Sequence, residues 1–267
     1  MLDTRRTLAA VLLSTLQWFC RVPAVAAEGF PFSIHNRSLR VVLAVPSGLL
    51  TVEDLRNGVV WRQYVPFQSA RGRAWGQVET RPIPPARLIR LTDATVDGTT
   101  IRAKATWKGS PFEVTYRLAE DEPTLTVTVD TPKRDERLPW QPGWAGVALM
   151  TYPYAFVNDE AGPEAAVPID EGVLWSIRET DPNVDYRRWN SSWLHQRLSM
   201  PWWGVTDGRR GVMTEVDTPF DCLFSVNWMR TPSGERTLPH VTWLDSKRTW
   251  AYPRRVTFRF FVEGGYV

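Results

Sequence analysis

The segment Phe112-Glu-Val-Thr-Tyr-Arg-Leu118 and the nearby segment Leu125-Thr-Val-Thr-Val129 decide the fold of this chain. Apolar residues occupy every second position in both segments, with threonine, arginine or glutamate between them. Because successive side chains of a β-strand point to opposite faces, this period of two predicts strands with one buried and one solvated face. Such strands are typical of antiparallel sheets that pack face to face.

Turn signals extend this pattern in both directions along the chain. Asn57-Gly58 and Asp97-Gly98 each stand between two apolar runs, and these dipeptides favour the tight turn of a β-hairpin. Asp207-Gly208 does the same within MPWWGVTDGRRGVMTEVDTP, residues 200–219. By contrast, Gln68–Pro85 carries three arginines and three prolines with little periodicity, so we expect a long exposed loop there.

The composition agrees with one large all-β domain. The chain has 267 residues, of which 43% are hydrophobic and 23% are charged, enough for a single core between packed sheets. Its 17 glycines and 21 prolines are scattered between short apolar runs, which favours many turns over a disordered tract. We therefore predict an all-β, mostly antiparallel fold with little helix, formed by residues 28–267 as one domain.

The first 27 residues have the pattern of a signal peptide. Arg5 and Arg6 precede the apolar run Leu8–Leu16, and small residues in Val22–Ala27 offer a cleavage site, so we expect an exported, periplasmic or extracellular protein. Both Sec and twin-arginine export stay open. Removing residues 1–27 takes away three arginines and one aspartate, which lowers the formal net charge from +3 to +1. We expect no nucleic acid as a partner and no membrane association after cleavage.

Residue types that bind metals or activate nucleophiles are sparse. The histidines His35, His195 and His240 stand apart, and no cluster of histidine, cysteine and carboxylate residues has the spacing of metal ligands. The sequence has no Gly-x-Ser-x-Gly elbow and no phosphate-binding glycine loop. Cys222 lies alone in an apolar run, as is typical of a buried small hydrophobe. We therefore expect no metal and no cofactor.

Tryptophan is the residue type that stands out. The chain contains 14 tryptophans, and several lie beside polar turn residues. An indole offers a flat apolar face and one N–H donor, which suits the C–H face and the hydroxyl rim of a sugar ring. The alternative is that most of these indoles fill a thick core. The candidates for carbohydrate contact are Trp140, Trp144, Trp193, Trp202, Trp203 and Asp207.

The adjacent tryptophans Trp202 and Trp203 narrow this choice. A regular strand directs neighbouring side chains to opposite faces, so one indole enters the core and the other points outward. The outward indole is the first candidate for a ligand platform. The sequence leaves open which of the two it is.

A second hypothesis assigns catalysis to this chain itself. The acidic pairs Asp159-Glu160 and Asp170-Glu171 are expected at strand ends, and His195 lies in an aromatic segment. In this hypothesis His195 and Glu171 act as acid and base of a sugar epimerase or polysaccharide lyase. The simpler interpretation is a packed, hydrogen-bonded histidine and solvated turn acids.

A set of motifs resembles one known family, the endo-α-N-acetylgalactosaminidase-like glycoside hydrolases. The resemblance is to their N-terminal β-supersandwich domain, which is similar to the galactose-mutarotase fold, and it covers nearly all of residues 28–267. The motifs are Gly48-Leu-Leu-Thr-Val-Glu-Asp-Leu-Arg-Asn-Gly-Val-Val-Trp61, Tyr152-Pro-Tyr-Ala-Phe156, Ile169-Asp-Glu-Gly-Val-Leu174, Met200-Pro-Trp-Trp-Gly-Val-Thr-Asp-Gly208 and Tyr252-Pro-Arg-Arg-Val-Thr-Phe258.

The resemblance implies a role beside a catalytic domain. In that family the supersandwich precedes a (β/α)₈ barrel that holds the catalytic carboxylates, and such a barrel needs about 250 residues. Because the sequence stops at Val267, we expect no counterparts of those carboxylates here. We expect a non-catalytic, carbohydrate-contacting accessory domain, as a fragment, a split product or a free-standing module. An alternative is a structural partner that docks on a separately encoded barrel through an exposed aromatic patch.

Overall fold

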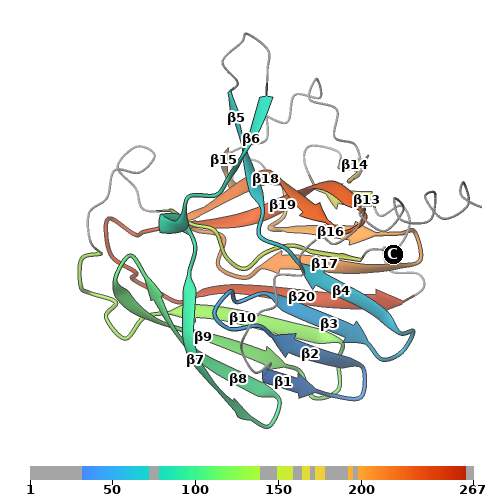
Figure 1. The fold of residues 1–267 in the computed structure, drawn as a ribbon, viewed down its shortest axis with the longest axis horizontal. Helices are drawn as coiled ribbons and strands as arrows, with labels where there is room; N and C mark the ends of the chain where they lie inside the picture. Colours follow the sequence, from blue (N-terminus) through green and yellow to red (C-terminus); the bar gives the residue numbers. More distant parts are fainter. Residues whose placement is uncertain are drawn as a thin grey trace, which may run out of the picture.

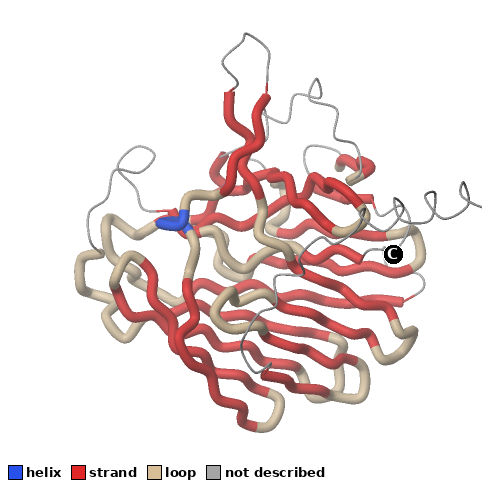
Figure 2. The backbone as a smooth tube through the Cα atoms, in the orientation of Figure 1, coloured by secondary structure: helices blue, strands red, loops and turns tan. Residues whose placement is uncertain are grey.

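All strands pair antiparallel in the computed structural model, which describes residues 32–71, 78–138, 149–158, 164–168, 172–177, 192–194 and 198–262. Within these residues the strands form three sheets, and the short 3₁₀ helix η1 spans Pro85–Arg87 (Figure 1, Figure 2). The predicted all-β antiparallel fold is confirmed. The predicted signal peptide, residues 1–27, lies outside the described residues.

The largest sheet has nine strands, and the two deciding segments form neighbouring strands within it. Leu118 lies opposite Leu125 and Tyr116 opposite Val127, so the apolar positions of both strands share one face, and all four side chains are buried. In spatial order the strands are β14 (Val173–Ser176), β13 (Glu164–Val167), β16 (Trp202–Thr206), β17 (Arg210–Val216), β20 (Arg254–Val262), β10 (Thr124–Asp130), β9 (Ser110–Leu118), β8 (Thr100–Trp107) and β7 (Arg90–Asp97).

Two smaller sheets complete the described fold. The five-stranded sheet contains β1 (Phe32–His35), β2 (Leu39–Leu43), β3 (Leu50–Asp54), β4 (Val59–Gln63) and β12 (Phe156–Asn158). The six-stranded assembly contains β11 (Leu149–Met150), β19 (Gly234–Leu244), β18 (Cys222–Thr231), β5 (Phe67–Arg71) and β6 (Val78–Pro82), with β15 (Ser192–Trp193) paired to β18.

Both smaller sheets pack on the same face of the nine-stranded sheet. Trp203 and Phe258 both lie in register with Thr214, so these side chains share that face. Phe258 contacts Phe156 of the five-stranded sheet at 4.9 Å between ring centroids, and Trp203 contacts Phe224 of the six-stranded sheet at 5.9 Å. The nine-stranded sheet therefore has one face in the core, and its other face carries the alternate residues of each strand.

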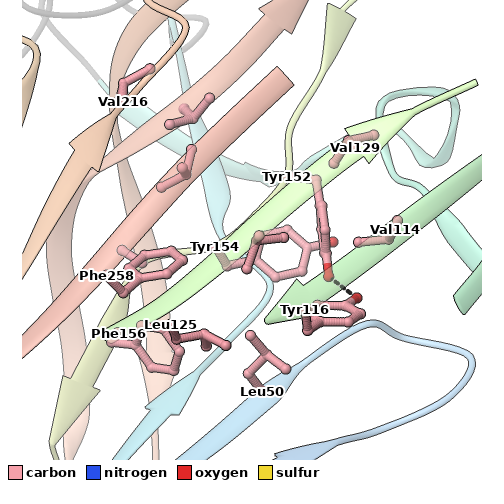
Figure 3. Close-up of a cluster of buried hydrophobic side chains, with 14 of the residues drawn as sticks. Leu50, Val114, Tyr116, Leu125, Val129, Tyr152, Tyr154, Phe156, Val216 and Phe258 are labelled. Atoms are coloured by element: carbon pink, nitrogen blue, oxygen red, sulfur yellow. Dashed lines mark hydrogen bonds between the residues drawn. The ribbon is translucent and has the colours of Figure 1, made fainter. Parts of the chain in front are cut away.

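Aromatic side chains fill the core between the sheets (Figure 3). The hydroxyl groups of Tyr116 and Tyr152 form a buried hydrogen bond, and the Tyr152 hydroxyl also donates to the Gly48 carbonyl at 3.1 Å. Gly48 has a positive φ of 73°, and a Cβ there would lie 3.0 Å from the Tyr152 ring, so any other residue would be strained at this position. Burial raises the pKa of both tyrosines, which keeps them neutral hydrogen-bonding groups.

The hairpins predicted from the dipeptide turns are present. Asn57-Gly58 joins β3 to β4, Asp97-Gly98 joins β7 to β8, and Asp207-Gly208 joins β16 to β17. The predicted loop over Gln68–Pro85 is wrong, because β5 and β6 pair as a ribbon that projects from the body of the molecule (Figure 1). Backbone hydrogen bonds can pair two strands without an apolar period, so the sequence pattern missed this ribbon.

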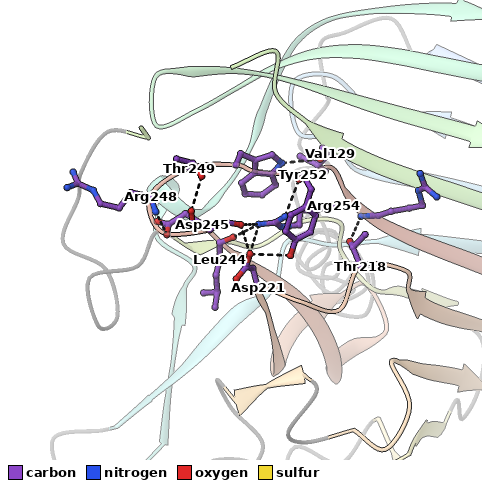
Figure 4. Close-up of polar contacts among 12 residues, drawn as sticks. Val129, Thr218, Asp221, Leu244, Asp245, Arg248, Thr249, Tyr252 and Arg254 are labelled. Atoms are coloured by element: carbon purple, nitrogen blue, oxygen red, sulfur yellow. Dashed lines mark hydrogen bonds and ion pairs between the residues drawn. The ribbon is translucent and has the colours of Figure 1, made fainter. Parts of the chain in front are cut away.

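Arg254 joins the nine-stranded sheet to the six-stranded one (Figure 4). Its side chain is fully buried, and its guanidinium donates to Ser246 Oγ at 2.8 Å, to Asp221 Oδ2 at 3.2 Å and to the Tyr252 carbonyl at 3.1 Å. The guanidinium also lies 4.7 Å from the centroid of the Trp250 ring. A buried charge with this many partners fixes how the two sheets meet, and removing it leaves Asp221 without its cation.

We predict that Arg254→Met lowers the free energy of unfolding by about 3 kcal/mol, because it breaks a buried ion pair from one side. Urea unfolding followed by tryptophan fluorescence measures the loss. The matched control is Arg230→Met, which removes an exposed guanidinium 3.2 Å from Glu235 and should cost at most about 1 kcal/mol. Equal losses in the two variants would contradict the assigned role of Arg254.

Candidate functional site

The solvent face of the nine-stranded sheet carries a transverse row of aligned side chains. Residues directly opposite one another on neighbouring strands share a face, so the register of five strand pairs defines the row. Because adjacent strands lie about 4.8 Å apart, six such residues extend over about 24 Å. The row consists of Trp202, Glu215, Thr257, Thr126, Arg117 and Thr100.

Trp202 is the indole at one end of this row. Strand alternation turns Trp203 into the core, where it is 2% exposed and packs on Phe224, and it leaves Trp202 partly exposed on the opposite face. The backbone N–H of Trp202 donates to the Met200 carbonyl at 2.8 Å, which helps to hold the start of β16. Of the two adjacent tryptophans, Trp202 is therefore the one that can contact a ligand.

The row beyond Trp202 is polar and already organised. Glu215 accepts a hydrogen bond from Arg259 Nε at 3.2 Å, and the Thr257 hydroxyl donates to Asp217 Oδ2 at 2.8 Å. Thr126 Oγ1 lies 3.3 Å from Thr257 Oγ1. The row thus combines a flat indole with one carboxylate, three threonine hydroxyls and one guanidinium. Thr257 is only 5% exposed, so the indole and the other four polar side chains are the groups open to a polyhydroxyl ligand.

Asp207 serves the turn of the β16–β17 hairpin. Its Oδ1 accepts from the backbone N–H groups of Arg209 and Arg210 at 3.0 and 2.7 Å, and the Arg210 guanidinium reaches its Oδ2 at 2.6 Å. Burial by itself would raise the pKa of Asp207, but the hydrogen bonds from Arg210 and Arg209 outweigh it and lower the pKa below its ordinary value. These contacts occupy the carboxylate within its own turn.

The other candidates lie on a different strand or outside the described residues. Trp193 belongs to β15, opposite Leu223 of β18. Trp202, Trp203 and Asp207 lie together in the β16–β17 hairpin. The predicted site residues that lie outside the described part of the chain are Trp140, Trp144, Glu171 and His195.

Two described residues with reactive side chains are buried in the core. His240 is 1% exposed, its Nδ1 accepts from the Ala155 N–H at 3.4 Å, and burial lowers its pKa to about 3. Cys222 is a free, buried thiol whose pKa is raised chiefly by burial, as expected for a small hydrophobe. Neither group is suited to acid–base or nucleophilic chemistry near neutral pH.

The described ranges contain neither a metal-binding cluster nor a membrane-spanning helix. Among those residues, no group of three or more histidine, cysteine or acidic residues is arranged to hold a metal ion. No helix in the same part of the chain is long and apolar enough to cross a membrane.

Sequence reasoning named both Trp202 and Trp203 as candidates and missed the polar residues aligned with Trp202. Glu215, Thr257 and Thr126 each occupy a polar position of an alternating strand, and that is the only signal the sequence carries for them. Which polar residues stand side by side depends on the register between strands far apart in the chain. Knowledge of the strand order would have been needed to find the row.

The described residues form an antiparallel all-β fold of packed sheets, with Trp202 on the outer face of the largest sheet. No protein-family model matches the sequence, and no curated protein is detectably similar to it. The fold is similar to part of the alpha-N-acetylgalactosaminidase NagBb from Bifidobacterium bifidum, a glycoside hydrolase, in its ligand-free form (TM-score 0.57, 11% identity) and in its GalNAc complex (TM-score 0.59, 13% identity).

The similarity covers 86% of this chain but only 36% of NagBb, so the chain spans about a third of that protein's length. At this identity the likeness shows the fold alone. It supports the resemblance to part of a glycoside hydrolase, whereas the supersandwich subtype and the galactose-mutarotase likeness stay predictions.

We predict that Asp207→Asn lowers the free energy of unfolding near neutral pH by about 1–2 kcal/mol, because the charged hydrogen bonds of the turn weaken. The folded-state pKa of Asp207 is lowered, so its contribution is present above the unfolded pKa of about 3.9 and is lost as the pH falls through the folded value. Urea unfolding at several pH values measures this. Asp97→Asn at the β7–β8 turn is the control. A difference in the free energy of unfolding between Asp207→Asn and the unmodified chain that does not change with pH would contradict the assignment.

We predict that His240 makes the protein less stable in acid. Because its folded pKa is lowered, the unfolded state binds the proton first, so stability is present above about pH 6.5 and falls below it by up to about 1.4 kcal/mol per pH unit. The stability of His240→Leu relative to the unmodified chain should therefore improve as the pH falls. The matched control is His35→Leu, which removes an exposed histidine in place of a buried one. Parallel stability profiles for His240→Leu and the unmodified chain would refute the prediction.

Proposed function

We propose that this chain is a non-catalytic, carbohydrate-contacting domain of an exported, glycoside-hydrolase-like protein. The observation that carries the proposal is Trp202, a partly exposed indole at the head of an aligned row of carboxylate, hydroxyl and guanidinium groups. The likeness to part of an alpha-N-acetylgalactosaminidase supports glycans that contain N-acetylgalactosamine as the first ligands to test.

Physical chemistry favours a sugar over other ligands on this face. The indole presents an apolar surface to the C–H face of a sugar ring, and the neighbouring side chains offer both donors and acceptors to its hydroxyl groups. Glu215 is paired with Arg259, so the charge near Trp202 is balanced and favours neither anions nor cations. An open face of this kind binds weakly, as suits a domain that holds substrate near a separate catalytic centre.

The proposed partner is a catalytic barrel, in the same chain or in a separate one. NagBb extends well beyond the part that this chain matches, which supports a further domain as the place of catalysis. The hypothesis that this chain is itself an epimerase or lyase depends on His195 and Glu171. An activity assay of the full chain on sugar and uronate polymers, with His195→Ala as control, tests that alternative.

A second candidate function is docking on such a barrel as a purely structural partner. Leu174 and Met200 are 59% and 50% exposed and lie on β14 and just before β16. Exposed apolar side chains close to an indole favour a protein contact as well as a sugar contact. Leu174→Ala separates the two candidates, because it removes apolar area without touching Trp202.

We predict that Trp202→Ala abolishes or weakens glycan binding by about tenfold, the effect of losing about 1.4 kcal/mol of indole contact. Affinity electrophoresis of the full chain in gels that contain desialylated mucin measures the retardation. Leu174→Ala is the matched control and should migrate like the unmodified chain, and circular dichroism checks the fold of both variants. Unretarded migration of the unmodified chain on mucin and on plant polysaccharides would leave only the docking role.

A further inference from the structure

A groove lies on the same solvent face, away from Trp202. It has a volume of about 780 Å³ and is formed by the outer sides of β7, β8 and β9 and by the segment that follows β10. This volume lies within the range of small-ligand sites, which is about 300–1,000 Å³. The side chains that line it include the charged residues Lys104, Glu113, Asp130, Arg134 and Asp135 and three threonines, among them Thr106.

The wall of the groove is held in place on the sheet. The Thr131 hydroxyl donates to the Pro111 carbonyl at 2.7 Å and accepts from the Lys133 N–H at 3.2 Å. Arg134 donates hydrogen bonds to Asp130 from both Nε and Nη2, and its Nε lies 3.0 Å from Asp130 Oδ1. Because these bonds tie the wall segment to β9 and β10, the groove is formed before any ligand arrives, which lowers the entropy cost of binding.

The floor of the groove contains two carboxylates that face one another, each with basic side chains beside it. Glu113 and Asp130 stand directly opposite one another on β9 and β10, and like charges in this position destabilise a sheet. Arg102 lies 3.7 Å from Glu113, and Arg134 lies on Asp130, so each carboxylate has a cation at its side.

The balance of charge selects the class of ligand. Lys104 and Arg134 offset most of the charge of Glu113, Asp130 and Asp135, so the groove attracts neither phosphates nor divalent cations strongly. Its side chains still offer carboxylate acceptors and ammonium and guanidinium donors side by side. A neutral polyhydroxyl ligand uses both kinds of group at once, whereas an ion would leave one kind unsatisfied.

We propose that this groove is a second contact site for one or two rings of a neutral glycan, on the same face as the Trp202 row. The ligand class rests on the proposed carbohydrate function, but the residues are separate. From strand spacing and residue rise, the groove lies on the order of 20 Å from Trp202. A polymeric or clustered glycan can engage both sites, and their linkage strengthens binding far beyond that of either site alone.

The test uses ¹⁵N-labelled full chain titrated with free N-acetylgalactosamine and followed by amide chemical shifts. The unmodified chain should show two groups of shifts, one in β8, β9 and residues 131–135 and one in β16 and β17. The double variant Lys104→Gln/Glu113→Gln should lose the first group and keep the second, and Trp202→Ala should do the reverse. On desialylated mucin each variant should weaken retention by at least about tenfold, because avidity is lost.

The control is Arg230→Gln/Glu235→Gln, which removes a similar exposed ion pair from the six-stranded sheet and should behave like the unmodified chain. Shifts confined to β16 and β17 would overturn the second site and leave the proposed function standing. Shifts in the groove that survive Lys104→Gln/Glu113→Gln would also overturn it. If neither region responds to the monosaccharide or to mucin, the proposed function fails and the second site falls with it.

Discussion

The structure depends on a register constraint in the nine-stranded sheet. A strand with one face in the core cannot slip by one residue without exposing every apolar side chain and burying every polar one. Val114, Val127 and Val256 are at most 1% exposed, so β9, β10 and β20 are held in register by burial. The same constraint aligns the residues of the opposite face, so the candidate binding surface is a consequence of core packing.

Polar contacts add to apolar burial in holding the sheets together. The seam between sheets contains Arg254 with Asp221 and Ser246, and the core contains the hydroxyl pair of Tyr116 and Tyr152. Apolar contact is non-directional, whereas these bonds have defined geometry, so they select one way of docking the sheets. The solvent face is thereby held by a rigid support, which a shallow binding site needs because it has no walls of its own to orient a ligand.

The proposed function follows from the different side chains on the two faces of the nine-stranded sheet. Most of the described aromatic side chains are buried in the core, including Trp61, Trp107, Trp203, Trp243 and Trp250. The solvent face keeps Trp202 and a field of threonines and paired charges, and it carries the groove beside Glu113 and Asp130. Weak sites spread over one flat surface suit an extended glycan better than a small molecule that must be enclosed.

The sequence by itself determined the local structure. The period of two in Phe112–Leu118, the Asp-Gly and Asn-Gly turns and the buried Cys222 all follow from interactions within a few residues or from hydrophobicity. Only the tertiary structure decided that Trp202 rather than Trp203 faces solvent, that β5 and β6 pair, and that Glu215 stands beside Thr257. These facts depend on strand order and register between distant segments, which local patterns do not encode because each strand only records which of its faces is apolar.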